Sequence, residues 1–204
     1  IVLFIIFGAF LERTGIASFF IDFANRVAGW SSGGPAKVAV ISSALCGMVS
    51  GSSVGNTVTT GSVTIPMMKK TGYKPEFAGA VEAAASTGGQ IMPPIMGAAA
   101  FLMAEYMDLP YAEVAVKAIL PAILYFSGIF IAVHLEAKKL GLQGIPRTEL
   151  PKWGYLLRNL YLILPLVLLV WLVSSGAKTM ATSAALSILA SFIIGFIHLL
   201  ATNL

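Results

Sequence analysis

Charged side chains are scarce in this sequence. Asp, Glu, Lys and Arg make up 11% of its 204 residues, whereas hydrophobic residues make up 57%. The mean hydropathy is +0.87. Such a composition cannot supply the polar surface of a soluble domain, so it indicates a polytopic membrane protein in a lipid bilayer. The few charges form no basic patch, which excludes a nucleic-acid partner despite the net charge of +4.

Cysteine and histidine are also rare, with one Cys and two His in the chain. A single cysteine, Cys46, excludes an internal disulfide and a cysteine-rich metal site, and its apolar neighbours predict a buried side chain. His134 and His198 have no Cys, Asp or His at metal-ligand spacing, so we expect packed or interfacial histidines and no transition metal. The sequence lacks a GxxxxGK phosphate loop, so we expect neither nucleotide hydrolysis nor a bound cofactor.

The first residues, 1–10, form an apolar run without a basic n-region or a small-residue cleavage site. This pattern is not that of a signal peptide. We therefore interpret the sequence as a fragment of a longer protein.

Long apolar runs predict the membrane spans. Residues 117–136, 156–173 and 179–200 are each long enough, at 1.5 Å per residue, to cross the roughly 30 Å of a bilayer core. Residues 1–11 read as the end of another span, and residues 16–30 as an amphipathic segment at the interface. The sequence thus predicts an all-α polytopic membrane protein.

The placement of charge orients these spans. Residues 69–74 and 138–158 are basic, whereas the loop at residues 105–113 is acidic. The two basic loops should face the cytoplasm. Residues 37–66 begin and end beside basic segments, so we predict a re-entrant hairpin whose tip lies at membrane depth. Irregular backbone at that depth must be buried in protein or line a wet cavity.

The tip of the predicted hairpin, SGSSVGNTVTTG at residues 50–61, is rich in side-chain oxygens and glycine. Neutral oxygens suffice for a monovalent cation such as Na⁺ that must leave again, and the start of the following half-helix offers free N–H groups to a carboxylate. A structural alternative stays open, because Gly47, Gly51 and Gly55 have the spacing of a helix-packing motif. The chain would then be a membrane subunit with no transport site of its own.

A second interruption follows at STGGQIMPP, residues 86–94. Its glycines and prolines break the helical pattern of residues 75–105. Two interrupted membrane segments in close succession indicate the binding site of a transporter.

Glu82 lies inside the first half of this broken helix. An ionisable residue inside a span is costly without a partner. We favour pairing with Lys37, Lys69 or Lys70 near the cytoplasmic face. The alternative is that Glu82 belongs to a proton or ion path.

Residues 50–106 carry a family resemblance in four motifs that occur in order. They are the Ser-Gly-Ser tip, the Ile-Pro-Met-Met-Lys-Lys exit, the Gly-Tyr-Lys-Pro turn and the Gly-Gly-Gln-Ile-Met-Pro-Pro break. The stretch closely resembles the large membrane subunit of TRAP (tripartite ATP-independent periplasmic) transporters, especially the type in which the small and large membrane subunits are fused. The resemblance covers residues 1–144 well, and the last two spans only generically.

The resemblance implies a permease of the bacterial or archaeal inner membrane, not an enzyme. It would use a Na⁺ gradient and an elevator-type motion to import small organic acids delivered by a periplasmic substrate-binding protein. A small membrane subunit, fused in the full-length chain, would be the second partner. Residues 1–144 would form the first of two inverted repeats as the transport core, and residues 145–204 a cytoplasmic linker and the first two spans of the second half.

The resemblance also implies a set of site residues. The predicted Na⁺ ligands are Ser50, Ser52 and Asn56 from the hairpin and the backbone carbonyls of Gly88, Gly89 and Met92 from the break, while Ser53 and Thr57 would approach the substrate. Many relatives carry Asp where this chain has Asn56, so its site would rely on neutral oxygens.

A rival from another class is an intramembrane serine hydrolase. A serine of residues 50–53 would be the nucleophile and His134 or His198 the base. The spacing around Ser50 is not the G-x-S-x-G elbow, and both histidines are predicted near the membrane faces rather than at the depth of the tip.

Overall fold

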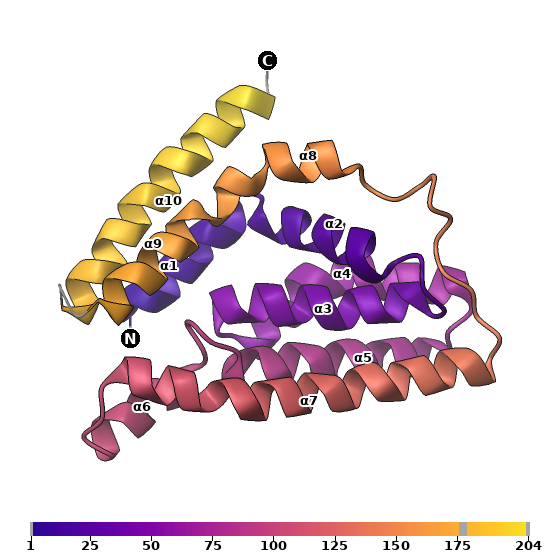
Figure 1. The fold of residues 1–204 in the computed structure, drawn as a ribbon, viewed down its shortest axis with the longest axis horizontal. Helices are drawn as coiled ribbons and strands as arrows, with labels where there is room; N and C mark the ends of the chain where they lie inside the picture. Colours follow the sequence, from indigo (N-terminus) through magenta and orange to yellow (C-terminus); the bar gives the residue numbers. More distant parts are fainter. Residues whose placement is uncertain (1, 176–178, 203–204) are drawn as a thin grey trace.

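The computed structural model describes residues 2–175 and 179–202, and every element that it describes is a helix (Figure 1). The prediction of an all-helical fold is therefore confirmed. In chain order the elements are α1 (Val2–Arg13), α2 (Ile16–Ala28), α3 (Gly34–Ser50), α4 (Ser53–Thr71), α5 (Pro75–Gly88), the 3-10 turn η1 (Gly89–Ile91), α6 (Ala98–Tyr106), α7 (Tyr111–Lys139), α8 (Trp153–Arg158), the 3-10 turn η2 (Leu160–Ile163), α9 (Leu164–Ser174) and α10 (Met180–Thr202).

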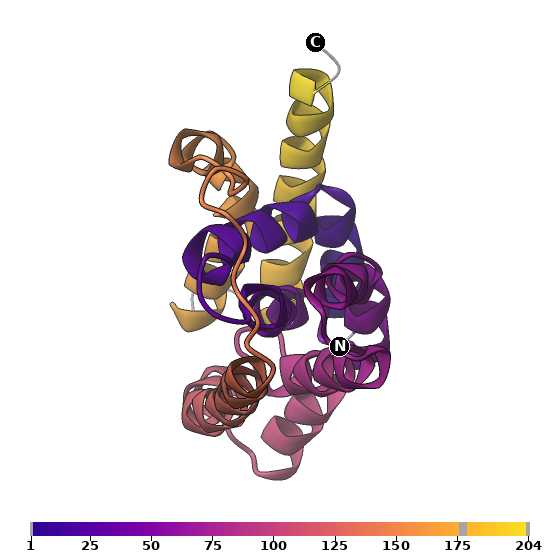
Figure 2. The same cartoon turned by 90° about the vertical axis from the view of Figure 1, so that its right-hand side faces the viewer.

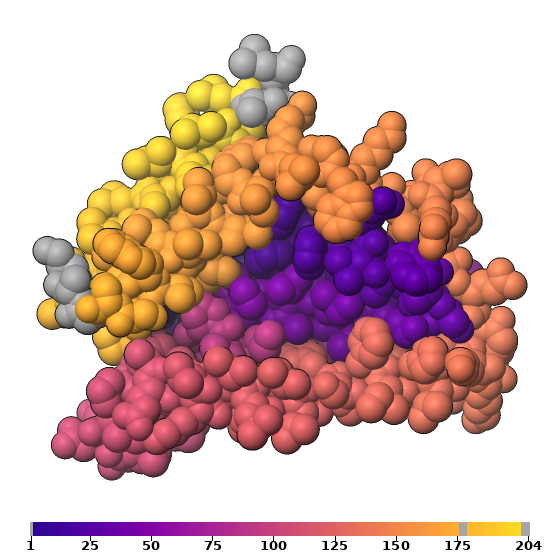
Figure 3. Space-filling view, in the orientation of Figure 1, coloured from indigo at the N-terminus to yellow at the C-terminus, as the bar shows by residue number. Residues whose placement is uncertain are grey.

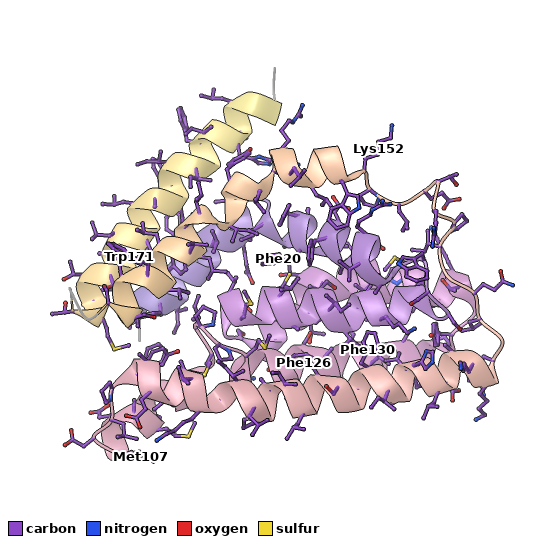
Figure 4. All side chains as sticks on the ribbon, viewed as in Figure 1. Phe20, Met107, Phe126, Phe130, Lys152 and Trp171 are labelled. Carbon is purple, nitrogen blue, oxygen red and sulfur yellow. The ribbon has the colours of Figure 1, made fainter. Side chains whose placement is uncertain are left out.

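The helices form two groups (Figure 1 and Figure 2). In one group, α10 packs against both α1 and α9. In the other, α3 is central and contacts α2, α4, α5, α7 and η1. Phe20 of α2 lies on the side facing α3 (Figure 4), and the buried side chains of α2 include Phe19, Phe20 and Ala24. The amphipathic pattern of α2 therefore marks the face that packs against its neighbours.

Helices α3 and α4 form a helical hairpin that is joined by a two-residue turn. Gly51 ends α3 in the left-handed conformation, with φ at +61°, and its N–H donates to the carbonyl of Gly47 at 2.9 Å. Ser52 then caps α4, because its side chain accepts the N–H of Gly55 at 3.2 Å. The residues that make the tip rich in glycine and serine are thus the ones that end one helix and start the next.

The next segment is broken where the sequence predicts. Helix α5 ends at Gly88, a 3-10 turn follows, and α6 begins only at Ala98. Pro93 and Pro94 lie between them, and proline has no N–H for the helical ladder. The break therefore leaves an irregular stretch of chain between two helical segments.

Both ends of the hairpin lie at one end of the molecule. The Tyr73 hydroxyl, just after α4, donates to the carbonyl of Gly33, just before α3, at 3.4 Å. Ser32 donates to the carbonyl of Leu142, just after α7, at 3.0 Å. Burial, with a contribution from Glu136, raises the pKa of Tyr73 to about 12. The basic segments therefore meet at this end, and the acidic loop between α6 and α7 lies at the opposite end (Figure 1).

Two described helices are long and apolar enough to cross a membrane, α7 and α10, and the bent pair α1 and α2 meets at 66°. The space-filling view shows α7 along the lower edge (Figure 3). Its exposed side chains include Val116, Leu120, Leu124, Ile131 and Leu135. This apolar surface suits the hydrocarbon of a bilayer.

The continuous span predicted for residues 156–173 is wrong in detail. The structure has α8, then Asn159, then the η2 turn running into α9. Pro165 explains part of the irregularity, because its ring conflicts with a regular helical bond to Tyr161 four residues earlier. Composition identified the apolar run and missed its interruption.

Candidate functional site

The hairpin and the break meet backbone to backbone at a pair of glycines. A Cβ built on Gly89 of η1 would lie 2.6 Å from the Cα of Gly47 in α3, and one on Gly47 would lie still closer to the Cα of Gly89. Glycine at both positions therefore allows the two main chains to touch. The small-residue spacing in α3 serves this close packing, as the structural alternative requires.

Asn56 lies beside this glycine pair and is fully buried. Its Nδ2 donates to the carbonyl of Ser43 on α3 at 2.8 Å. Its Oδ1 is buried and has no hydrogen-bond partner among the described residues. A buried acceptor without a partner costs about 1–3 kcal/mol. The oxygen is thus available to a cation or another donor.

The tip itself touches the segment after the break. The N–H of Ile95 donates to the carbonyl of Met48 at 3.3 Å, and a Cβ on Gly51 would overlap the carbonyl oxygen of Met96. The hydroxyl of Ser50 contacts the backbone of Ser52 at 3.4 and 3.5 Å. The tip serines therefore lie next to the chain that leads into α6.

The remaining predicted site residues point in several directions. A Cβ on Gly88 would meet the ring of Tyr125 on α7 at 2.5 Å. Met92 lines a pocket between α3 and α7 together with Phe126 and Phe130, the two rings that rise from α7 in Figure 4. The structure thus brings Asn56 to Gly89, and places Gly88 and Met92 against α7.

Ser53 and Thr57 lie in the first turns of α4 and are half-buried. The Thr57 hydroxyl donates to the carbonyl of Ser53 at 2.8 Å. Val54 and Val58 beside them are 74% and 69% exposed. This face of the hairpin is therefore open in the described part of the chain, and a substrate role for the two residues stays a prediction.

The contact between the hairpin and the break lies halfway along the longest helix. Gly88 packs against Tyr125 and Phe126, which are in the middle of α7. Because α7 is long enough to cross a bilayer, a chain that spans the membrane along α7 holds the break near mid-depth.

Sequence reasoning missed the cluster around Glu82. This side chain is fully buried in the middle of α5, and its carboxylate accepts hydrogen bonds from four hydroxyls on α3, α4 and α5: Ser43, Thr60, Thr64 and Ser86. The signal was present in α4, where Asn56, Thr60 and Thr64 repeat every four residues and so share one helix face.

The predicted pairing of Glu82 with a lysine is wrong. The ion pairs of the described residues both lie on α7. The Lys37 ammonium instead donates to Ser31 at 3.0 Å and lies 5.5 Å from the ring centre of Phe130. Lys69 and Lys70 are exposed at the end of α4. Hydroxyls on the packed helix faces reach the carboxylate, and none of these three lysines pairs with it in the described part of the chain.

The histidines and the cysteine lie outside this site. His198 bonds to the Tyr161 hydroxyl at 2.5 Å and lies beside Gly15, at the bend between α1 and α2. His134 lies on α7, more than two turns beyond Phe126 toward the basic end. Cys46 is buried as predicted. Among the described residues no group of three His, Cys, Asp or Glu has the arrangement of a metal site.

Comparison with known proteins agrees with the fold and with the motifs. The family model described as "Tripartite ATP-independent periplasmic transporter, DctM component" matches residues 1–202. The chain belongs to this family. The match extends through α10, so the last helices of this TRAP permease are included, beyond the part that the motifs alone identify.

Several curated relatives of this TRAP permease carry transporter names. The C4-dicarboxylate TRAP transporter large permease protein DctM of Pseudomonas aeruginosa is 28% identical over 197 residues, which are 96% of this chain and 46% of that protein. The sialic acid TRAP transporter large permease protein SiaM of Vibrio cholerae is 23% identical, over 94% of this chain and 45% of that protein. The sialic acid TRAP transporter permease protein SiaT of Haemophilus influenzae is 24% identical, over 94% and 31%. The chain spans less than half the length of these relatives.

Proposed function

We propose that this chain is part of the permease of a Na⁺-coupled secondary transporter of the inner membrane, importing small organic acids from a periplasmic binding protein. Membership of the TRAP family and relatives named for C4-dicarboxylate and sialic acid transport support this proposal. A small membrane subunit is the second partner, fused or separate. Na⁺ is the coupling ion, and the hairpin is re-entrant.

The observation that carries the proposal is the buried Oδ1 of Asn56, without a partner, beside the contact of Gly47 and Gly89. A cation bound there gives the oxygen its missing partner. Because ligands would come from both the hairpin and the break, the ion would hold the two together. An elevator-type motion requires that the hairpin and the break move together as one body with the ion site. The predicted carbonyls of Gly88 and Met92 and the hydroxyls of Ser50 and Ser52 complete the proposed ligand set.

Replacing Asn56 by alanine should lower Na⁺-driven uptake by on the order of tenfold, the effect of losing about 1.4 kcal/mol of ion binding. The reason is that, among the described residues, Asn56 supplies the side-chain oxygen that is buried at this contact without a hydrogen-bond partner, and the variant loses it. The measurement is substrate uptake into proteoliposomes by the full-length permease with its binding protein, under imposed Na⁺, K⁺ or H⁺ gradients. Asn56→Asp should keep Na⁺ dependence, because it keeps an oxygen at this position and adds negative charge.

Ser62→Ala is the matched control, because Ser62 is on the same helix and exposed, with its hydroxyl donating to the carbonyl of Thr59. Unchanged Na⁺ dependence in Asn56→Ala would contradict the proposed site. If Asn56→Ala instead loses folded protein, while each remaining molecule keeps its Na⁺ dependence, the structural alternative is the correct one.

A further inference from the structure

The residues around Glu82 form a built polar site that the proposed Na⁺ site does not use. We call Glu82, Ser43, Thr60, Thr64 and Ser86 the Glu82 cluster; all five are fully buried. The cluster joins α3, α4 and α5, so it lies between both arms of the hairpin and the first half of the broken helix.

Hydrogen bonds reach both carboxylate oxygens. Oε1 of Glu82 accepts from Ser43 at 2.7 Å, from Thr60 at 2.5 Å and from Ser86 at 3.0 Å. Oε2 accepts from Thr64. Gly61 makes room for the side chain, because a Cβ there would lie 3.0 Å from Cγ of Glu82. The pocket is therefore shaped around this carboxyl group.

No cation of the packed helices reaches the carboxyl. The lysines of α3 and α4 lie elsewhere, as described above, and Tyr125 of α7 donates to the carbonyl of Ala84 at 3.0 Å. Cys46 is close enough to interact electrostatically with Glu82, and it carries no positive charge. The other ionisable residues on the helices packed against α5, and on α5 itself, are Lys37, Lys69, Lys70, Glu76, Tyr111, Glu113, Lys117, His134, Glu136, Lys138 and Lys139.

The distances in the cluster are those of O–H···O hydrogen bonds. The oxygens of Ser43 and Thr60 are 3.0 Å apart, and both lie against the same carboxylate oxygen. These groups therefore form one closed hydrogen-bond network around the carboxyl group.

The threonines have a second acceptor available. The Thr60 hydroxyl lies 2.8 Å from the carbonyl of Asn56, and the Thr64 hydroxyl lies 3.0 Å from the carbonyl of Thr60. Each hydroxyl has a single hydrogen, so it donates to the carboxylate or to the backbone. An ionised Glu82 takes these hydrogens, and a protonated Glu82 lets them turn to the backbone. Both charge states are therefore satisfied without moving a helix.

The cluster is also linked to the proposed Na⁺ site. The carbonyl of Ser43 accepts from Asn56, while the hydroxyl of Ser43 donates to Glu82. The Thr60 hydroxyl likewise lies within hydrogen-bond distance of both Glu82 and the backbone carbonyl of Asn56. A change of charge on Glu82 thus reaches Asn56 through one residue on each arm of the hairpin.

We propose that the Glu82 cluster is a proton-binding site, separate from the proposed Na⁺ site, through which proton uptake and release modulate transport. A proton from water adds to a carboxylate oxygen and later returns to water, with no other bond made or broken. The link to transport rests on the proposed function. The binding of the proton does not.

Infrared difference spectroscopy on the purified full-length permease tests proton binding without any transport assay. A pH titration should reveal a carboxylic-acid C=O band that is lost in Glu82→Gln and kept in Glu76→Gln. Glu76 is the matched control, because it is an exposed Glu on the same helix. Ser86→Ala retains Glu82 and removes a donor to the carboxyl whose printed acceptor is Glu82 itself, so it should shift this band to higher frequency, which identifies the group even if Glu82→Gln does not fold.

The same variants in proteoliposomes test the link to transport. Uptake driven by a fixed Na⁺ gradient should depend on pH in the wild type and in Glu76→Gln, and lose that dependence in Glu82→Gln. The proposal is overturned if no titrating band differs between wild type and Glu82→Gln, if Na⁺ rather than pH removes the band, or if Glu82→Gln keeps the pH dependence. Uptake without Na⁺ dependence in the wild type would contradict the proposed function and leave the infrared result standing.

Discussion

Replacing Gly89 by alanine should reduce uptake by the permease roughly 5- to 150-fold, the equivalent of about 1–3 kcal/mol of overpacking. The added Cβ would lie 2.6 Å from the Cα of Gly47. The atom that the Cβ would meet belongs to the main chain of Gly47, so no side chain can rotate to make room. The break must therefore move away from the hairpin, which separates Gly89 from Asn56. The measurement is initial uptake per folded molecule in proteoliposomes, together with the melting temperature.

Gly79→Ala is the control for this prediction. Gly79 lies in α5 of the same broken segment, and nothing is within 4 Å of a Cβ built there. Alanine at this helical position should leave uptake unchanged and stabilise the protein by about 0.5–1 kcal/mol. Equal uptake by the Gly89 and Gly79 variants would mean that the hairpin and the break do not touch in the working transporter.

Replacing Gly51 by alanine should have the second large effect, because two costs combine at this position. A left-handed residue with a Cβ costs about 1–2 kcal/mol. The added Cβ would also overlap the carbonyl oxygen of Met96. We expect a lower melting temperature of the purified permease and weaker Na⁺-dependent uptake, because the tip would be forced away from the segment after the break.

Gly141→Ala separates the two costs of the Gly51 substitution. Gly141 has φ at +66°, close to the +61° of Gly51, and nothing lies within 4 Å of its added Cβ. Gly141→Ala should therefore lower the stability only by the cost of the left-handed conformation. If both variants melt at the same temperature and transport equally well, the contact between Gly51 and Met96 contributes nothing.

Patterns local in the chain predicted much of this fold. Prolines and glycines determine the break after Gly88, and the Gly-Ser sequence at Gly51 determines the turn between α3 and α4. These features depend on backbone conformation, which a few neighbouring residues control. The interruption between α8 and α9 was not predicted, because a single Asn and a single Pro barely change the hydropathy of a long apolar run.

The candidate site was predicted less completely. The motifs and the resemblance that they carry implied that Asn56 and Gly89 belong to one ion site. The structure places the two residues close together, and their role as ligands stays a prediction. They could not show that Gly88 and Met92 face α7, because the direction of a residue within a break depends on how the two halves are placed. Nor could they pair Glu82 with hydroxyls, since its partners are 4, 18, 22 and 39 residues away in sequence.

The sequence by itself determined the membrane class, the helical fold, the positions of the tip and the break, and the family. Each of these follows from composition, from proline and glycine chemistry, or from motifs in order along the chain. Only the tertiary structure decided which groups meet. It placed Gly47 against Gly89, left Oδ1 of Asn56 without a partner among the residues described, and buried Glu82 among hydroxyls rather than beside lysines. The physical reason is that packing of whole helices sets such contacts, and burial then leaves each polar group only the partners within hydrogen-bond reach.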